Sequence, residues 1–211
     1  VVVGTSPPIF QLASAWLIAC LRRRPFVLEV RDLWPAFAVD MGVLKNRFII
    51  RLAEFVERFF YARACMIIVN SPAYVDYLGE RGIASQRIRL VANGVDPDEF
   101  ASTCEQNQTR NVCDLNGQFV VTYAAALGQA NDMQTVLSAA EALRDHPEIH
   151  FLLLGDGQMR SLVEQRVRDE QLENVTVAGS LPKHQMGAAL GGSDACLATL
   201  RDIPMFRMTY P

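Results

Sequence analysis

The sequence predicts an α/β protein with two domains, each built on a parallel sheet. Short, continuously apolar segments alternate with longer segments whose apolar residues recur at helical spacing. Strands that are apolar throughout are typical of parallel sheets with helices on both faces. A polar turn at Asn93-Gly94 interrupts this alternation near the middle of the chain, and the two sides of the turn differ in charge.

The first half is expected to alternate strands and helices from its first residues. Residues 1–3 read as a short buried strand. Thr5-Ser6-Pro7-Pro8 then predicts a helix start, because a hydroxyl residue can cap the first turn and a proline there gives up no needed hydrogen bond. The further elements expected before the turn are helix 9–21, strand 26–30, helix 46–63, strand 65–69, a helix from Ser71-Pro72 and strand 87–91.

The helix expected at 46–63 carries an apolar stripe at helical spacing. Its members are Phe48, Ile49, Leu52, Phe55, Val56, Phe59 and Phe60. Packing against a sheet is the expected use of such a stripe. The alternative is contact with an anionic membrane, because four arginines, at 47, 51, 58 and 63, accompany the aromatic residues.

The second half resumes the alternation after a polar segment, 101–116, that is expected to be irregular. The elements expected there are strand 119–123, helix 133–143, strand 149–154, helix 159–170, strand 175–177, helix 183–190 and strand 195–197. The predicted domains are therefore 1–92 and 93–211.

The charge distribution supports two domains. Residues 1–92 hold 12 Lys and Arg against 7 Asp and Glu, a net charge of +5, and residues 93–211 hold 8 against 16, a net charge of −8. The basic half suits an anionic surface. Nucleic acid is not an expected partner, because there is no basic tract with interleaved aromatic residues.

The cysteines and the hydropathy bear on localisation. The five cysteines form no CxxC pair and are odd in number, which indicates a reducing compartment. The longest apolar run, residues 10–21, falls short of the roughly 20 residues of a membrane span. We expect a cytoplasmic protein.

Parallel sheets place ligands at the carboxyl ends of their strands, so these positions are the candidate site. At the end of strand 26–30, Arg31 could bind a phosphate, and Asp32, kept ionised by its neighbour, could act as a base. The alternative is a surface ion pair.

Three further strand ends are rich in small residues. The segment from Tyr123 to Gln129 could let its backbone approach a ligand, or could simply be a tight turn. Gly155-Asp156-Gly157 could present N–H groups to an anion, or Asp156 could be a helix cap. The segment 178–182, which includes Gly179, lies where an exposed backbone could face a flat base.

No metal site is expected. Asp96-Pro97-Asp98 has the spacing of a DxD motif but lies in the polar linker, where a solvated loop is the better interpretation. Pro147 prevents His146 and His150 from sharing a helical face.

Taken together and in order, the motifs resemble those of bacterial family 4 glycosyltransferases. The branch that they resemble most is that of capsule, O-antigen and colanic acid assembly. The segments concerned are 4–10, 25–46, 63–78, 91–100, 119–133, 151–157, 174–182 and 206–211, so that the resemblance covers nearly the whole chain.

The resemblance implies a GT-B fold, with two Rossmann-like domains facing a cleft. Residues 1–92 would be part of the acceptor domain, and residues 93–211 the hinge and first part of the nucleotide-sugar domain. It also implies a retaining, metal-independent reaction without a cofactor, a lipid-linked saccharide acceptor and possible contact with the inner face of the plasma membrane. A glycine-rich loop would precede Val1 and an acidic region would follow Pro211, making the chain an internal fragment.

The resemblance also assigns residues. Arg31-Asp32 matches a catalytic His-Asp pair in which Arg replaces His, so Asp32 is the candidate base. The segment from Tyr123 matches a donor-phosphate loop in which Ala125 and Ala126 replace Gly and Asn. The same resemblance places Gly128, Gln129 and the glycines of Gly155-Asp156-Gly157 and Gly179 near the nucleotide.

Two other functions stay open. A sugar-nucleotide epimerase of the same fold would need acidic and histidine residues in the cleft that the sequence does not supply. A non-catalytic nucleotide-binding partner is suggested by the alanines at 125 and 126.

Overall fold

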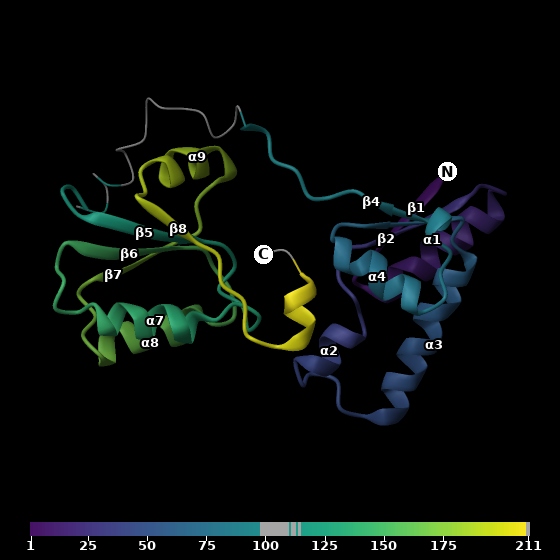
Figure 1. Cartoon of the computed structure of the whole chain (residues 1–211), viewed down its shortest axis with the longest axis horizontal. Helices are drawn as coiled ribbons and strands as arrows, with labels where there is room; N and C mark the ends of the chain where they lie inside the picture. The colour runs from purple at the N-terminus through teal and green to yellow at the C-terminus, as the bar shows by residue number, and fades with distance from the viewer. Residues whose placement is uncertain (98–109, 111–112, 114, 210–211) are drawn as a thin grey trace. The chain divides into compact units, whose positions relative to one another are not determined.

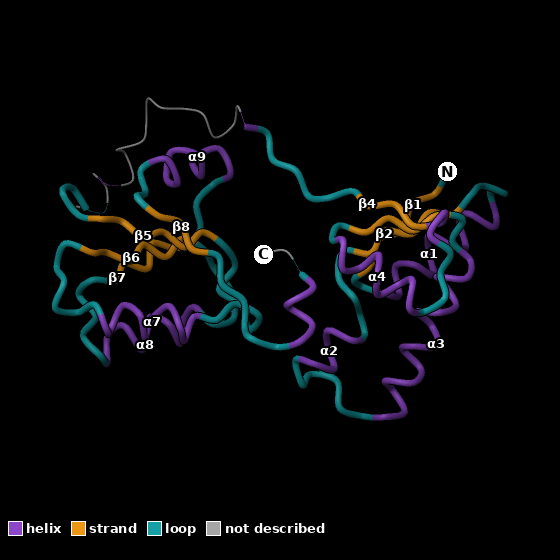
Figure 2. Tube along the Cα trace, viewed as in Figure 1, coloured by secondary structure: helices purple, strands orange, loops and turns teal. Residues whose placement is uncertain are grey.

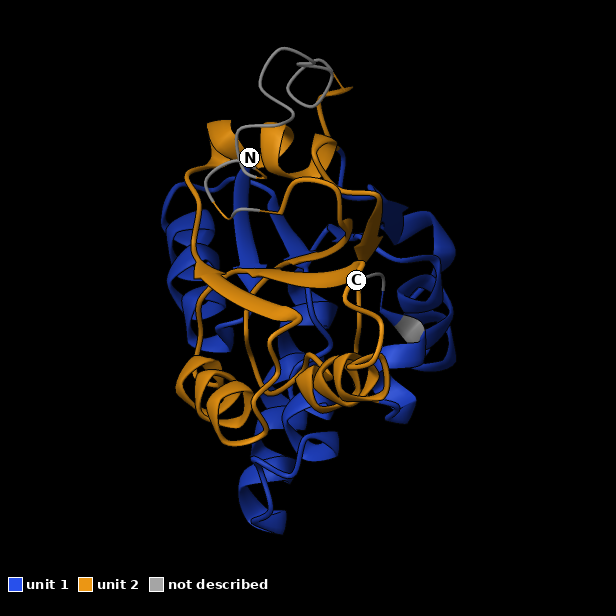
Figure 3. Ribbon diagram, turned by 90° about the vertical axis from the view of Figure 1, so that its left-hand side faces the viewer, with its two compact units in different colours: residues 1–94, 202–210 blue, residues 95–201, 211 orange. Residues whose placement is uncertain are grey.

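The chain forms two compact units in a computed structural model that describes residues 1–97, 110, 113 and 115–209 (Figure 3). Unit 1 comprises residues 1–94 together with the described residues from 202 onward, and unit 2 comprises the described residues from 95 to 201. The expected second domain, 93–211, differs from unit 2 in its last segment. The reason is that Met205 and Phe206 are buried in unit 1, where Phe206 packs edge-on against Phe37 at 5.2 Å between ring centroids.

Unit 1 is built on a four-stranded parallel sheet of order β1-β2-β3-β4 (Figure 1). Its strands are β1 (Val2–Ser6), β2 (Phe26–Val30), β3 (Met66–Val69) and β4 (Ile88–Leu90). Its helices are α1 (Ile9–Leu21), α2 (Ala36–Asp40), α3 (Arg47–Arg63), α4 (Pro72–Glu80), η1 (Ser85–Arg87) and η2 (Pro204–Met208). The sequence did not predict α2, η1 or η2.

The core of unit 1 lies on one face of this sheet. Alternate residues of β2, such as Leu28 and Val30, are buried with α1, α3 and α4, and Figure 2 shows these helices on one side of the strands. The intervening residues, Val27 and Glu29, are only partly buried. The expectation of cover on both faces is therefore wrong for the described part of unit 1.

Helix α3 differs most from its expected packing. Its buried residues are Ala53, Glu57, Phe60 and Tyr61. Phe48, Leu52 and Phe55 are 75%, 53% and 62% exposed, and Ile49 is exposed as well. The amino-terminal half of α3 extends away from the sheet (Figure 1), so only its carboxyl-terminal half packs on the core. The expected core role of the stripe is thus wrong for its first four members.

Unit 2 is a second four-stranded parallel sheet, of order β7-β6-β5-β8. Its strands are β5 (Phe119–Ala124), β6 (Ile149–Leu154), β7 (Val175–Gly179) and β8 (Ala195–Leu197). Its helices are α7 (Met133–Ala142), α8 (Arg160–Asp169) and α9 (Lys183–Gly191). Most of the linker expected at 101–116 lies outside the described residues.

Both faces of this second sheet are covered, as predicted. Tyr123 and Leu153 point into a core with α7 and α8, whereas Val120 and Leu152 point into a core with α9. Figure 1 shows α7 and α8 on one side of the strands and α9 on the other. Burial on both faces explains why β6 is apolar almost throughout.

Local sequence signals set several helix starts. The Asn46 side chain accepts hydrogen bonds from Phe48 N at 2.9 Å and Ile49 N at 3.4 Å, and the Asp132 side chain accepts one from Thr135 N at 3.3 Å. The predicted hydroxyl cap at Thr5-Ser6 is wrong. These residues extend β1, and α1 begins after Pro8 without a side-chain cap.

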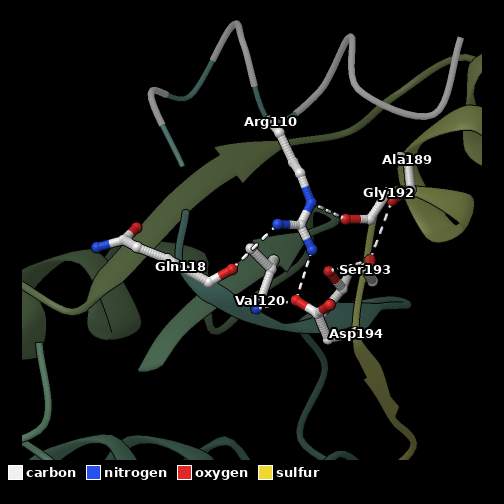
Figure 4. A network of polar contacts seen from close by, with 8 residues as sticks. Arg110, Gln118, Val120, Ala189, Gly192, Ser193 and Asp194 are labelled. Atoms are coloured by element: carbon white, nitrogen blue, oxygen red, sulfur yellow. Dashed lines mark hydrogen bonds and ion pairs between the residues drawn. The ribbon is translucent and has the colours of Figure 1, made fainter. Parts of the chain in front are cut away.

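A polar network anchors the chain to the edge of the sheet in unit 2 (Figure 4). The Arg110 guanidinium donates to the backbone oxygens of Gly192 and Gln118 and to the Asp194 carboxylate. That carboxylate also accepts from Val120 N at 2.7 Å, and these bonds lower the pKa of Asp194. Arg110 therefore connects β5 to the turn before β8.

None of the helices in the described part of the chain has both the length and the apolar character to cross a membrane.

Candidate functional site

The carboxyl ends of β5, β6 and β7 meet at a pocket within unit 2. The pocket has a volume of ≈ 320 Å³. Its lining residues are Ala124, Ala125, Ala126, Leu154, Gly155, Asp156, Ser180, Leu181 and Met186. Ala125, Gly155 and Asp156, which the sequence singled out separately, are therefore brought together.

Most other predicted residues of unit 2 lie around this pocket and do not line it. Gly128 and Gln129 follow the Ala125–Leu127 segment, Gly157 follows Asp156, and Gly179 precedes the lining residue Ser180. Ser180 and Leu181, from the segment 178–182 that the sequence singled out, do line it. Sequence reasoning missed Met186, because a residue on α9 reaches the pocket only through the fold.

The glycines of the turn after β6 allow two backbone segments to interlock. A Cβ at Gly155 would lie 1.9 Å from Ala125 O, and a Cβ at Gly157 would lie 2.5 Å from Leu127 O. Both glycines also have positive φ angles, +157° and +154°, that L-residues rarely adopt. The close approach is held by Leu127 N donating to Asp156 O and Met159 N donating to Leu127 O, both at 2.9 Å. These glycines therefore have a structural role whether or not a ligand binds.

Asp156 stabilises the turn and is not the cap of α8. Its carboxylate accepts from Gly157 N at 2.7 Å and forms an ion pair with Arg160 at 3.3 Å. Arg160 also bonds to Glu164 at 2.8 Å. The Asp156 charge at the rim of the pocket is thus balanced by a neighbouring guanidinium.

Several backbone N–H groups at the pocket make no hydrogen bond within the described structure. Those of Ala126, Asp156 and Ser180 have no acceptor among the described residues, while Ala125 N and Gly155 N are used, by Leu154 O and Gly179 O. N–H groups left without an acceptor at the end of a parallel sheet are suited to an anionic ligand.

The backbone conformations at Ala125 and Ala126 do not require glycine. Among the described residues other than glycine, positive φ angles occur only at Arg23 and Gln171. Both alanines are exposed and lie in ordinary backbone conformations. Their methyl groups therefore add surface to the pocket without straining the loop.

In unit 1, Arg31 and Asp32 follow β2, as expected. Arg31 N donates to Ser6 O at 2.9 Å, and the Asn70 side chain donates to Arg31 O at 3.2 Å, so the ends of β1, β2 and β3 hold this loop. Asn70, at the end of β3, was not predicted, because a lone asparagine after a strand carries no specific signal.

The ionisation of Asp32 differs from its expected state. Burial raises the pKa of Asp32, and the charge of Arg31 lowers it by less. Arg31 thus acts in the expected direction, but burial outweighs it, so the net shift of the Asp32 pKa is upward. Asp32 also lies close enough to Tyr74 for its charge to raise the pKa of that phenol, after the larger effect of burial.

Within the described residues, no group of three or more His, Cys, Asp or Glu side chains is arranged to hold a metal ion.

Comparison with known proteins relates the chain to glycosyltransferases. Residues 1–94 match the family described as "Glycosyl transferase 4-like domain". The putative colanic acid biosynthesis glycosyl transferase WcaI of Escherichia coli (strain K12) is 23% identical over 180 residues, which are 82% of this chain and 44% of that protein.

Solved structures share the fold. Anabaena Alr3699/HepE, in complex with UDP and glucose, superposes with a TM-score of 0.73 at 17% identity, over 92% of this chain and 51% of that one. WaaG, a glycosyltransferase involved in lipopolysaccharide biosynthesis, gives a TM-score of 0.63 at 12% identity, over 89% and 57%. The chain thus spans about half the length of the proteins that it matches. The resemblance to family 4 glycosyltransferases and the GT-B fold are confirmed.

Proposed function

We propose that the full-length protein transfers a sugar from a nucleotide-sugar donor to a lipid-linked saccharide acceptor during the synthesis of a surface polysaccharide. The roles of WcaI and WaaG, in colanic acid and lipopolysaccharide biosynthesis, support this reaction class. The observation that carries the proposal is the convergence of three strand ends on one pocket in unit 2.

The donor would bind in unit 2, with its diphosphate at the unbonded N–H groups of Ala126, Asp156 and Ser180. HepE binds UDP and UDP-glucose on the same fold, which supports a donor site of this kind. Preorganised N–H groups stabilise the charge that develops on a leaving diphosphate. Gly128, Gln129 and Gly179 would shape the loops around it.

Calorimetric titration of the full-length protein with UDP, and with GDP for comparison, tests this donor site. Ala126→Asp places a negative charge in the pocket and should weaken binding by about tenfold or more, the effect of roughly 1.4 kcal/mol. Ala139→Asp puts the same change on an exposed position of α7 and should leave binding unchanged. Binding of neither nucleotide, or equal effects of the two variants, would exclude a donor site here.

Asp32 is proposed to take the proton of the acceptor hydroxyl, with Arg31 binding a phosphate group nearby. In the full-length enzyme, Asp32→Asn should lower the rate by roughly 100-fold while changing the melting temperature little. The wild-type rate should rise with pH through the raised pKa of Asp32, since only the carboxylate can accept a proton. Near-normal turnover of the variant would make the Arg31-Asp32 pair structural.

The reaction is proposed to be retaining and metal-independent. The anomeric configuration of the product, determined by NMR, tests the first point, and activity after exhaustive chelation tests the second. A protein that binds UDP tightly without turning over any nucleotide-sugar would instead be a non-catalytic partner. Interconversion of two nucleotide-sugars would identify an epimerase.

The protein is further proposed to be cytoplasmic and to contact the inner membrane surface through α3. Phe48, Leu52 and Phe55 leave this helix largely exposed, and Arg47 and Arg51 lie on the same segment. Each buried apolar side chain contributes roughly 1.5–3 kcal/mol and each basic residue about 1 kcal/mol near anionic lipid.

Co-sedimentation of the full-length protein with vesicles tests this contact. Leu52→Ser with Phe55→Ser should reduce binding to phosphatidylserine vesicles, whereas Leu17→Ser, which removes an exposed leucine of α1, serves as the control. Equal binding of wild type to neutral and anionic vesicles would exclude the electrostatic part of the proposal.

A further inference from the structure

A second pocket, of ≈ 420 Å³, lies within unit 1 between α2, α3 and α4. Aliphatic side chains, among them Val39 and Ile50, form one part of its wall, and the Tyr77 phenol together with carboxyl and guanidinium groups forms the rest. No sequence motif pointed to this pocket, because its lining residues come mainly from three separate helices, each of which contributes side chains of mixed polarity.

The least exposed polar group in its wall is Glu57, which is only 5% exposed. Its carboxyl accepts a hydrogen bond from the Tyr61 hydroxyl at 2.8 Å. Among the described residues, no Lys or Arg forms an ion pair with it. A buried carboxyl that faces a cavity and has no ion-pair partner is typical of functional groups.

The charges of the wall restrict the ligand. Three carboxyl side chains, Asp40, Glu54 and Glu57, would repel a phosphate, and two guanidinium groups, Arg58 and Arg81, would repel a cation. Both kinds of group bind hydroxyls, which donate to carboxylates and accept from guanidinium groups. The aliphatic wall suits the C–H face of a sugar ring.

We propose that this pocket binds a neutral sugar residue of the acceptor, with Glu57 as its buried hydrogen-bonding partner. The inference rests on the proposed transferase function only in taking this sugar to be part of the acceptor. The binding of a sugar to the pocket does not itself require turnover. Pro35 and Ala36 of the wall directly follow the loop that holds Asp32, so the pocket and the candidate base share one segment.

The protonation of Glu57 should affect this binding. Burial raises the pKa of Glu57 to about 7, against smaller lowering effects of the Tyr61 hydrogen bond and of Arg81. The charged and titratable groups around it are Asp40 from α2, Glu54, Arg58 and Tyr61 from α3, and Tyr77 and Arg81 from α4. A hydroxyl donates more strongly to a carboxylate than to a neutral acid, so sugar affinity should rise with pH through this range.

Methyl-detected NMR titration of the full-length protein tests the proposal. The probes are the methyl glycosides of glucose, galactose, mannose and N-acetylglucosamine, with inorganic phosphate added separately. At least one glycoside should shift the Ile50 methyl signal, with a dissociation constant on the order of 1 mM, as expected for so small a ligand. The Ile83 methyl, in a different pocket of unit 1, should not respond.

Variants separate binding from structure. Glu57→Gln keeps the size and the acceptor for Tyr61, and should weaken the glycoside by roughly threefold or more at high pH and remove the pH dependence. Asp76→Asn, at the pocket that contains Ile83, should change neither. The proposal is overturned if no glycoside shifts Ile50, if phosphate alone does so, or if Glu57→Gln binds as wild type at every pH. UDP titration of the same samples reports separately on the donor site.

Discussion

Replacing Glu57 with glutamine should stabilise unit 1 at neutral and alkaline pH. Glu57 is buried, and its pKa is raised from 4.5 to about 7 chiefly by that burial. The folded state therefore holds this proton more tightly than the unfolded state does. Between these two pH values the folded state binds more protons, so the free energy of unfolding must fall as pH rises.

The size of the effect follows from the same interval. From 4.5 to about 7, at about 1.4 kcal/mol per pH unit, the ionised carboxyl costs the folded state about 3 kcal/mol. Glutamine cannot ionise and still offers an oxygen to the Tyr61 hydroxyl. The variant should thus match wild type near pH 4.5 and exceed it by up to about 3 kcal/mol at pH 8.

Tryptophan fluorescence is a suitable assay, because both tryptophans, Trp16 and Trp34, belong to unit 1. Urea unfolding of the two proteins at several pH values between 4.5 and 8 gives the difference in free energy of unfolding at each pH. Asp32, whose pKa is also raised, is present in both proteins, so its contribution cancels.

Glu54→Gln provides the matched control. Glu54 lies on the same helix, is only partly buried and also lines the pocket. Its charge makes only a small contribution to the raised pKa of Glu57, so its replacement should change the free energy of unfolding by less than about 1 kcal/mol at every pH. A Glu57→Gln difference that stays constant from pH 4.5 to 8 would refute the argument that burial disfavours the charged form.

Three further predictions concern stability. Gly155→Ala should destabilise unit 2 by about 2 kcal/mol or more, because the new Cβ would collide with backbone atoms. Gly128→Ala should cost less, because its Cβ would meet only a side chain, at 3.3 Å. Thermal melting followed by far-UV circular dichroism compares the two variants. Arg110→Ala should cost about 2–3 kcal/mol by leaving several acceptors without their donor, against about 0.5 kcal/mol or less for Arg207→Ala, whose ion pair is exposed, in the same assay. Asn46→Ala should cost about 1 kcal/mol in urea unfolding by removing the cap of α3, and no loss would mean that this helix end is not cooperative with the core.

The strands and most helices could be predicted from the sequence because their signals are local. Strands β2, β6 and β8 and helix α1 have the predicted bounds. The helices α2 and η2 were missed, since each is only five residues long and shows too little periodicity to identify.

The face on which α3 packs could not be predicted from its apolar stripe. The stripe through Phe48, Leu52 and Phe55 and the buried face through Ala53 and Glu57 are offset by five residues, about 140° around the helix. Because Glu57 lies on the buried face, the sequence makes the apolar stripe appear to be the face that packs on the core. Only the tertiary structure shows that the more apolar face is the exposed one.

The candidate site in unit 2 was predicted in part. The rule that ligands bind at the carboxyl ends of parallel strands located segments that line this pocket, because the rule depends only on topology. The rule could not show that Gly155 and Gly157 are needed to leave room for the backbone of residues 125–127, because that contact joins two segments that are distant in the sequence.

The placement of the glycines bears on the alanines that distinguish this chain from the family pattern. A glycine is indispensable only where a Cβ would collide or where φ is positive. Those positions are Gly155, which lines this pocket, and Gly157 and Gly179, which lie beside it. Ala125 meets neither condition, and it contacts Gly155 through its carbonyl oxygen. Its methyl group can therefore be accommodated without moving the backbone N–H groups of Ala126 and Asp156, which are the groups that a diphosphate would need. Ala125 and Ala126 are thus weaker evidence for a non-catalytic nucleotide-binding partner than their place in the motif alone suggests.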